Sequence, residues 1–573
     1  MHLRLPLLSL MFALPLTPAL AQQKPAQKQN VVKFGDVTLS AYTRIEGNLN
    51  FSNTTVSGTR TLLVIPDKAS GSELRLHADT IGVKSTEDSP FEATEMSGHV
   101  RYTLTQKTKE GTRILEGTAG HATFRRTTRL IELSQGVDST LTDAERLAQP
   151  GTFRAGKITA DLSKSPVLYT LSGNASETDI RFKPKESSGK AELKTEIAET
   201  HISRFREGSF QVGQTALFRG AETVADFLNP AGKSSGQIKA ALVEAKFTET
   251  KSRLKSATAT GNVRYRLSRL GEDGKAEESL DGTAGEVVYD YLNQMPRYVL
   301  KDNVEVTVIS PKQIRGPAMF SADRVEIDQL AEVKDKPQSY RYTLTSRPGN
   351  ALVSFTPLAP KPPLPGKSAL AFRLGTLTIK QFEKGTLETG KSFSLSGKRV
   401  LFDSTDKESG SEAKFSSESV VGTYLEAGVI GSATASGNVE FSINQPSRKV
   451  GIKTRAAQAI KGKSSRVLYV TGKEERSITF AGPLSAQLID TDTLEKPGVI
   501  TAKSGDKLIL TLTDDSYDLS MDTPSEASTV VLEPKIKSKK QDTPSPKPDV
   551  KNPTSTNPAS TPPTSTKTEK GAR

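Results

Sequence analysis

Apolar and polar residues alternate along most of this chain. Three matching stretches carry the clearest alternation, at Val100, Tyr102 and Leu104, at Val263, Tyr265 and Leu267, and at Val439, Phe441 and Ile443. A period of two predicts β-strands with one buried face. Helical periodicity is scarce, and only residues 140–148 and 222–228 are predicted to form short helices on connections. The pattern therefore predicts an all-β fold.

A glycine stands shortly before each of these strands. In two of the three copies the next residue is asparagine, and in the first copy it is His99. Glycine and asparagine both tolerate positive φ, so a tight corner is expected just before each strand. His99 is interpreted as a turn residue and not as a catalytic base. The predicted structural turns are at Gly47, Gly98, Gly261 and Gly437.

These phrases recur because the chain is internally repeated. Segment 93–104 returns at 257–267 and again at 433–443, and each copy ends later in a similar apolar strand that closes on a proline. Repetition of a whole strand-and-turn unit indicates tandem modules. The predicted modules are residues 31–184, 210–357 and 368–534, with a proline-rich linker at 358–367.

The two ends of the chain differ from the modules. Residues 1–21 have a basic start, an apolar stretch and a small-residue A-x-A site, which predicts a cleaved signal peptide and a location outside the cytoplasm. The apolar stretch is too short to cross a hydrocarbon core of roughly 30 Å as a helix. Residues 535–573 hold nine Lys or Arg, three acidic residues and almost no apolar ones. This composition predicts a disordered basic tail rich in Pro, Ser, Thr and Lys.

Composition excludes several kinds of chemistry. The chain has no Cys and five His, so disulfides, Cys-bound metals and thiol nucleophiles are excluded. Acidic clusters at 403–408 and 514–522 lack the ligand spacing of a calcium loop, and the serines at 416–419 lack a nucleophile elbow. Slightly less than half of the net charge of +13 lies in the tail, and the rest forms no basic stripe with aromatic residues. We expect no catalytic residues, no metal, no cofactor and no nucleic-acid partner.

The phrase at 282–290, followed by 298–306, resembles the OstA-like family, which includes periplasmic lipopolysaccharide-transport proteins of the LptA and LptC type. The resemblance implies open β-jellyrolls, each a U-shaped pair of antiparallel sheets around an apolar groove for acyl chains. It makes the nine alternating apolar residues candidates for the wall of that groove. It also implies lipopolysaccharide or a related envelope lipid as ligand, and end-to-end contacts with other jellyroll transport proteins.

The residues themselves leave the function open between classes. Alternating apolar residues fit a closed core as well as a groove. The main prediction is a protein that binds and transfers lipid without covalent chemistry. Burial of each acyl CH₂ group contributes about 0.8 kcal/mol to the binding free energy, so several acyl chains would bind without a specific polar site. The alternative is a structural or adhesive extracytoplasmic β-repeat protein that binds proteins or cell-wall polymer. A polysaccharide-active β-helix enzyme would need a short rung repeat, which the sequence does not have.

Overall fold

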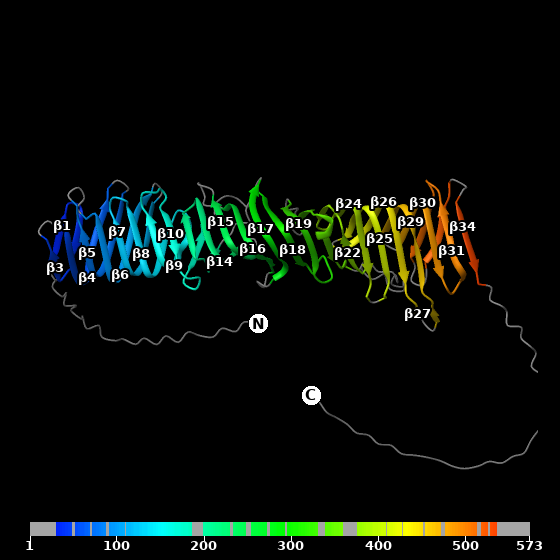
Figure 1. Cartoon of the computed structure of the whole chain (residues 1–573), viewed down its shortest axis with the longest axis horizontal. Coiled ribbons are helices and arrows are strands. Elements are labelled where there is room, and N and C mark those ends of the chain that lie inside the picture. The colour runs from blue at the N-terminus through cyan, green and yellow to red at the C-terminus, as the bar shows by residue number, and fades with distance from the viewer. Residues whose placement is uncertain are drawn as a thin grey trace, which may run out of the picture.

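The computed structural model is an elongated rod of antiparallel strands, along which the chain passes once from one end to the other (Figure 1). The all-β prediction is confirmed. In the part of the chain that the structure describes, no helix is long and apolar enough to cross a membrane. The structure describes residues 30–535 except 49–51, 69–70, 87–90, 109–110, 186–198, 230–232, 248–253, 272–275, 293–294, 331–338, 359–374, 408, 427, 451–452, 472–475, 513–516 and 525–527.

Three predictions fall largely outside these described residues. They are the signal peptide at 1–21, the linker at 358–367 and the tail at 535–573. They stay predictions, as do the jellyroll form and the number of modules.

Long strands form most of the rod and fall into three consecutive sets. The first set is β4 (Asn53–Asp67), β5 (Ser72–Lys84), β6 (Ala93–Thr108), β7 (Gly111–Arg125), β8 (Leu130–Asp143) and β9 (Leu147–Asp161). The second is β14 (Thr215–Asn229), β15 (Ser234–Phe247), β16 (Leu254–Leu270), β17 (Ala276–Leu292), β18 (Met295–Ile309) and β19 (Ala318–Gln329). The third is β24 (Ser392–Thr405), β25 (Glu412–Glu426), β26 (Val429–Gln445), β29 (Gln458–Thr471) and β30 (Arg476–Asp490).

Shorter strands lie between these sets and at the two ends. At the N-terminal end are β1 (Val31–Phe34), β2 (Val37–Ser40) and β3 (Arg44–Gly47). The first junction holds β10 (Leu168–Ser172), β11 (Asp179–Pro184), β12 (Glu199–Ser203) and β13 (Glu207–Gln211). The second holds β20 (Tyr340–Thr345), the 3-10 turn η1 (Pro348–Asn350), β21 (Leu352–Phe355), β22 (Thr376–Lys380) and β23 (Lys384–Glu388). At the C-terminal end are β31 (Leu494–Ala502), β32 (Lys507–Leu512), β33 (Tyr517–Asp522) and β34 (Thr529–Pro534). A small separate ribbon pairs β27 (Arg448–Val450) with β28 (Lys453–Arg455).

Each long strand bends in the middle and contributes one half to each of two facing layers. Layer A begins with β2 and one half of each strand from β4 to β9, and continues at the first junction through β11 and β12. It then includes the matching halves of β14 to β19, followed by β21 and β22 at the second junction. The matching halves of β24 to β26, β29 and β30 come next, and β31 and β34 complete the layer. Layer B runs through β3 and the other halves of the long strands, with β10 and β13 at the first junction, β20 and β23 at the second, and β32 and β33 at the end. The layers are thus joined by bent strands along one side of the rod, while hairpin connections lie on the other.

Left-handed residues lie at the bends of β6, β16 and β26. Gly98, Gly261 and Gly437 have φ of +76°, +86° and +81°, and the next residue in each case is also left-handed. The pairing register shifts at these points, for example between Ser97 and Val100, as in a β-bulge. The corner therefore lies inside a continuous long strand and not before a separate one, because both halves of the strand remain paired with the same neighbours.

Two sequence predictions about local structure are wrong. Residues 140–148 belong to β8, its tight connection and β9, and residues 222–228 belong to β14, so neither segment is helical. Pairing with strands on both sides outweighs the weak helical pattern there. Gly47 also differs from the other three predicted corners. It ends β3, pairs with Thr54 in a hairpin and is not among the residues with positive φ.

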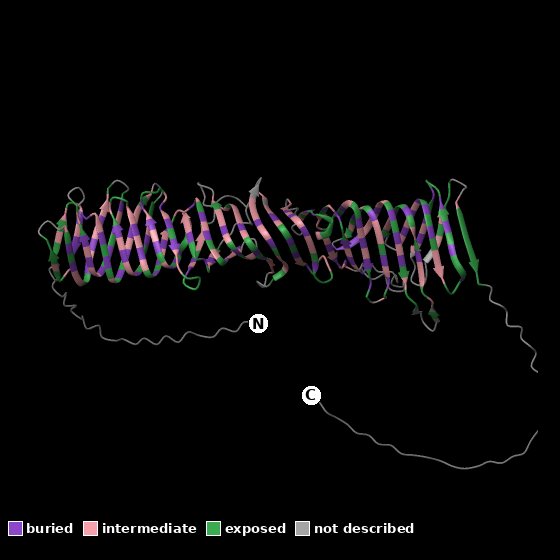
Figure 2. Ribbon diagram, viewed as in Figure 1, coloured by how far each residue is buried: buried purple, intermediate pink, exposed green. Residues whose placement is uncertain are grey.

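The interior is apolar along the described length of the rod. Buried residues alternate with exposed ones along the strands, as the purple and green bands of Figure 2 show. One core cluster extends from Val37 to Phe218 and a second from Ala240 to Leu510, and both include or contact residues of β15. The two clusters therefore adjoin, and they form a long interior between the layers.

Candidate functional site

The nine candidate groove residues lie in the interior of the rod, on the layer A halves of β6, β16 and β26. Eight of them are buried, with exposed fractions from 0% at Val100 to 9% at Ile443, and Leu267 is half-buried. The alternation in the sequence therefore corresponds to a buried face. Contact of these residues with acyl chains stays a prediction.

An aromatic ring paired with a glycine recurs at the middle of each stretch. Tyr102 is directly opposite Gly117, and Tyr265 is directly opposite Gly282. A Cβ atom built on Gly282 would lie 2.3 Å from the Tyr265 hydroxyl oxygen and 2.3 Å from the backbone oxygen of Glu305. The ring thus occupies the space that a side chain on the neighbouring strand would fill.

The third stretch repeats this pairing with phenylalanine. Phe441 is directly opposite Gly462 on β29. Sequence reasoning missed these glycines as partners of the rings, although the phrase that contains Gly117 and Gly282 is visibly repeated. The signal was the repetition of a glycine that no turn requires.

The two tyrosine hydroxyls reach beyond the glycine strand. Tyr102 shares a hydrogen bond with the Ser139 hydroxyl on β8, and Tyr265 donates to the backbone oxygen of Glu305 on β18 at 3.5 Å. Burial raises the pKa of both phenols far above their usual range. These side chains are therefore neutral at physiological pH.

Aromatic rings also connect the two layers across the interior. Phe441 of layer A lies 4.3 Å from Phe480 of layer B, measured between ring centroids. Phe153 and Phe210 stack across the layers at 4.9 Å near the first junction. The interior is thus filled by side chains at these points, as in a packed core.

One buried ion pair interrupts the apolar interior. Arg113 on β7 donates to the Asp143 carboxylate at 2.8 Å, and the two side chains are only 6% and 4% exposed. Tyr169 on β10 lies close to this pair, and burial raises its pKa to about 12. Its hydroxyl has no hydrogen-bond partner among the described residues. No feature of the sequence distinguished these three residues.

The ends of the rod present strands with unused edges. Among the described residues, β34 pairs only with β31, and β1 pairs only with β2. Apolar side chains are exposed on these two strands, at Val530, Val531, Leu532 and Val31. An unpaired edge with exposed apolar residues can accept a strand from another chain.

No group of three His, Asp or Glu side chains is placed to hold a metal ion in the described part of the chain. Asp403 and Asp406 lie on or next to β24, and most of the second acidic cluster, at 514–522, lies on β33 or outside the described residues. The sequence matches no family model and no curated protein.

Proposed function

We propose that this protein binds envelope lipid such as lipopolysaccharide in the interior of the rod and transfers it along the rod, without covalent chemistry. The main support is the apolar interior, which extends between the layers from Val37 to Leu510. Burial of acyl CH₂ groups in such an interior contributes about 0.8 kcal/mol each, so affinity needs no specific polar site.

The architecture provides a path for opening the interior. The layers are covalently continuous along the side where the long strands bend, while hairpins end on the other side. If the hairpins of layer A moved away from those of layer B, the interior-facing residues, among them Tyr102, Tyr265 and Phe441, would become exposed without breaking a strand. The resemblance of the repeated phrases to the OstA-like family supports the same function and a periplasmic location.

The strand edges at the ends of the rod support a role for partner chains. A jellyroll partner that adds a strand to β34 or β1 would extend both the sheet and its apolar interior. Such end-to-end contacts would let lipid pass between proteins.

A second function is favoured by the close packing of the interior. The 4.3 Å contact between Phe441 and Phe480 is typical of a closed core, which fits a structural or adhesive β-repeat protein. In that case the strand edges would bind partners and the interior would bind nothing.

Photo-cross-linking can separate the two functions. A photoreactive phenylalanine analogue replaces Tyr265, which faces the interior, or its neighbour Arg266, whose side chain is 70% exposed. The full-length protein is then cross-linked in cells and analysed by mass spectrometry. Lipid adducts at position 265 and not at 266 are the expected result. If both positions lack lipid and the purified protein carries none, transport is rejected in favour of the structural function.

A further inference from the structure

A hollow of about 830 Å³ lies on the outer face of layer A in the second set of long strands. Its lining residues come from β15 to β19, from η1 and from β21 and β22, which are layer A neighbours in that order. None of them belongs to layer B, and Lys239, Arg264 and Lys380 are exposed, so the hollow opens on the outer face. Its lining also includes the interior residues Tyr265 and Val306, but most of its charged lining residues are exposed, and the function proposed below does not depend on lipid binding.

One rim of the hollow is held in place by a network around Asp323. The Arg347 guanidinium donates to this carboxylate at 3.0 and 3.1 Å, and the Asn350 amide donates at 2.7 Å. The Ser321 hydroxyl in turn donates to the Asn350 backbone oxygen at 3.0 Å. Turn η1 is therefore fixed against β19, and the hollow has a defined wall.

Three cations of the hollow, Lys239, Arg264 and Lys380, have no counter-ion among the residues that the structure describes. Lys239 and Arg264 are directly opposite each other on β15 and β16, a placement that is unfavourable for like charges. No carboxylate of the described residues lies within ion-pair distance of these two side chains or of Lys380, which also lines the hollow. Arg266 is the exception, because it pairs with Asp281.

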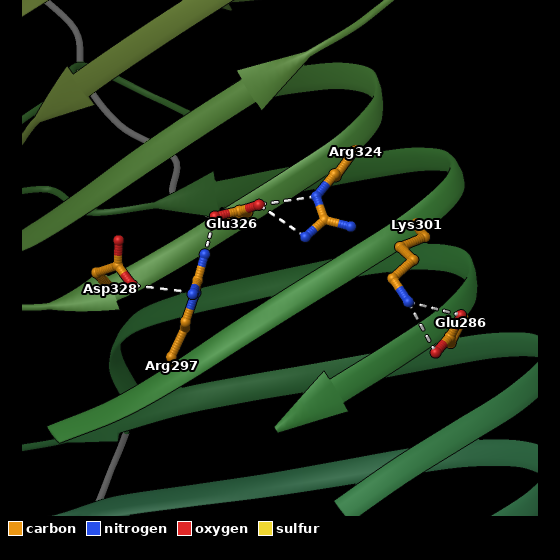
Figure 3. Close-up of polar contacts among 6 residues, drawn as sticks. All are labelled: Glu286, Arg297, Lys301, Arg324, Glu326 and Asp328. Atoms are coloured by element: carbon orange, nitrogen blue, oxygen red, sulfur yellow. Dashed lines mark hydrogen bonds and ion pairs between the residues drawn. The ribbon is translucent and has the colours of Figure 1, made fainter. Parts of the chain in front are cut away.

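The opposite layer of the same strands is different (Figure 3). There, Lys301 pairs with Glu286 at 3.1 Å, Arg324 pairs with Glu326 at 2.7 Å, and Arg297 contacts both Glu326 and Asp328. In layer A, Arg266 and Arg269 of the same strands are also paired, with Asp281 and Glu278, whereas Lys239 and Arg264 have no counter-ion among the described residues. A bound anion would relieve the repulsion between Lys239 and Arg264.

The length of the hollow indicates an extended ligand. Seven neighbouring strands contribute to it, which at about 4.8 Å per strand corresponds to roughly 29 Å along the rod. Lys239 and Arg264 lie toward one end and Lys380 toward the other, with the Glu305 carboxylate between them. We propose that the hollow binds an acidic polysaccharide chain lying along the axis of the rod.

Other polyanions fit this surface less well. An extended acidic peptide gains affinity by pairing its main chain with a sheet edge, and here the backbone groups of the sheet face are already paired in ladders. Glu305 would repel polyphosphate, which has no hydroxyl donors. A sugar chain can place hydroxyl groups at Glu305, which accepts hydrogen bonds, and carboxylates at the cations on either side.

Calorimetric titration of the full-length protein tests the proposal. The probes are a hexamer of galacturonic acid, its neutral methyl ester and inorganic polyphosphate, each at low and physiological salt. We expect the acidic hexamer to bind, and Arg264→Ala or Lys380→Ala to weaken binding by about tenfold. Arg101→Ala is the matched control, because Arg101 occupies the same place in the first repeat and does not line the hollow. It should leave affinity unchanged.

Several results would overturn the proposal. Equal binding of the neutral ester would show that the cations do not recognise the ligand. Tighter binding of polyphosphate than of the sugar acid would assign a different ligand class. An equal loss with Arg101→Ala would show unspecific attraction to the whole protein. Glu305→Gln adds a further check, because it should weaken sugar binding and strengthen polyphosphate binding.

Discussion

Phe441→Ala tests whether the interior is packed in solution. The ring is 5% exposed and lies 4.3 Å from Phe480 in the opposite layer. Truncation of a buried phenylalanine costs about 3–5 kcal/mol, and more where the site cannot collapse. Directly opposite is Gly462, which has no side chain to fill the space. We therefore expect a loss near the upper end, about 4–5 kcal/mol.

Part of this loss belongs to the contact between the layers. A double-mutant cycle with Phe480→Ala isolates the pair, and a coupling of about 0.5–1.5 kcal/mol is expected for two aromatic rings in contact. The matched control is Leu425→Ala, because Leu425 is 58% exposed. That variant should stay within about 0.5 kcal/mol of the parent.

The assay is urea unfolding followed by circular dichroism, with the slope m compared between variants. Hydrogen exchange of β26 and β30 provides a second readout, since a rod of repeated strands can open locally. A loss below about 1 kcal/mol for Phe441→Ala, together with zero coupling to Phe480, would refute the packed interior. The layers would then be separated in solution even before lipid enters.

Three further predictions follow from other features. Arg113→Met alone should lower the free energy of unfolding by about 3–5 kcal/mol, because it leaves the Asp143 charge buried without a partner. The double variant with Asp143→Leu should regain most of that free energy, as measured by urea unfolding. Hydrogen bonds from Arg347 hold the pKa of Asp323 well below its ordinary value of 3.8, so this carboxylate stabilises the fold above that pH and loses its effect as the pH falls further. Asp323→Asn should therefore lower the melting temperature at pH 7 and have a shrinking effect in acid, and a constant difference would contradict this. A chain ending at Lys535 should melt at the same temperature as the parent, because the residues removed are poor in apolar side chains, and a lower melting temperature would show that they pack.

The sequence predicted the strands well because their pattern is local. The alternation at Val263 and Tyr265 requires only a strand with one buried face. The left-handed corner at Gly261 could also be predicted, because few residues other than glycine adopt that conformation. That this corner lies inside a long strand could not be predicted. Its place depends on whether the segments before and after the corner both pair with neighbouring strands.

Contacts between distant segments could not be predicted. The pairing of Tyr265 with Gly282 depends on strand register, and the contact of Phe441 with Phe480 depends on how the two layers face each other. The unpaired cations of the hollow became visible only when register placed Lys239 beside Arg264. Single-residue patterns carry no information on such pairs.

The two junctions have a mechanical consequence. In each long strand a single backbone passes through both layers, so a displacement of one layer is transmitted directly to the other. At the junctions, β11 and β12 carry layer A while β10 and β13 carry layer B, and only loops connect them. At these places no strand is shared between the layers, so one layer is displaced relative to the other against side-chain contacts alone, such as the stack of Phe153 on Phe210. Under torque or bending load the rod should therefore bend at the two junctions and stay rigid along the sets of long strands.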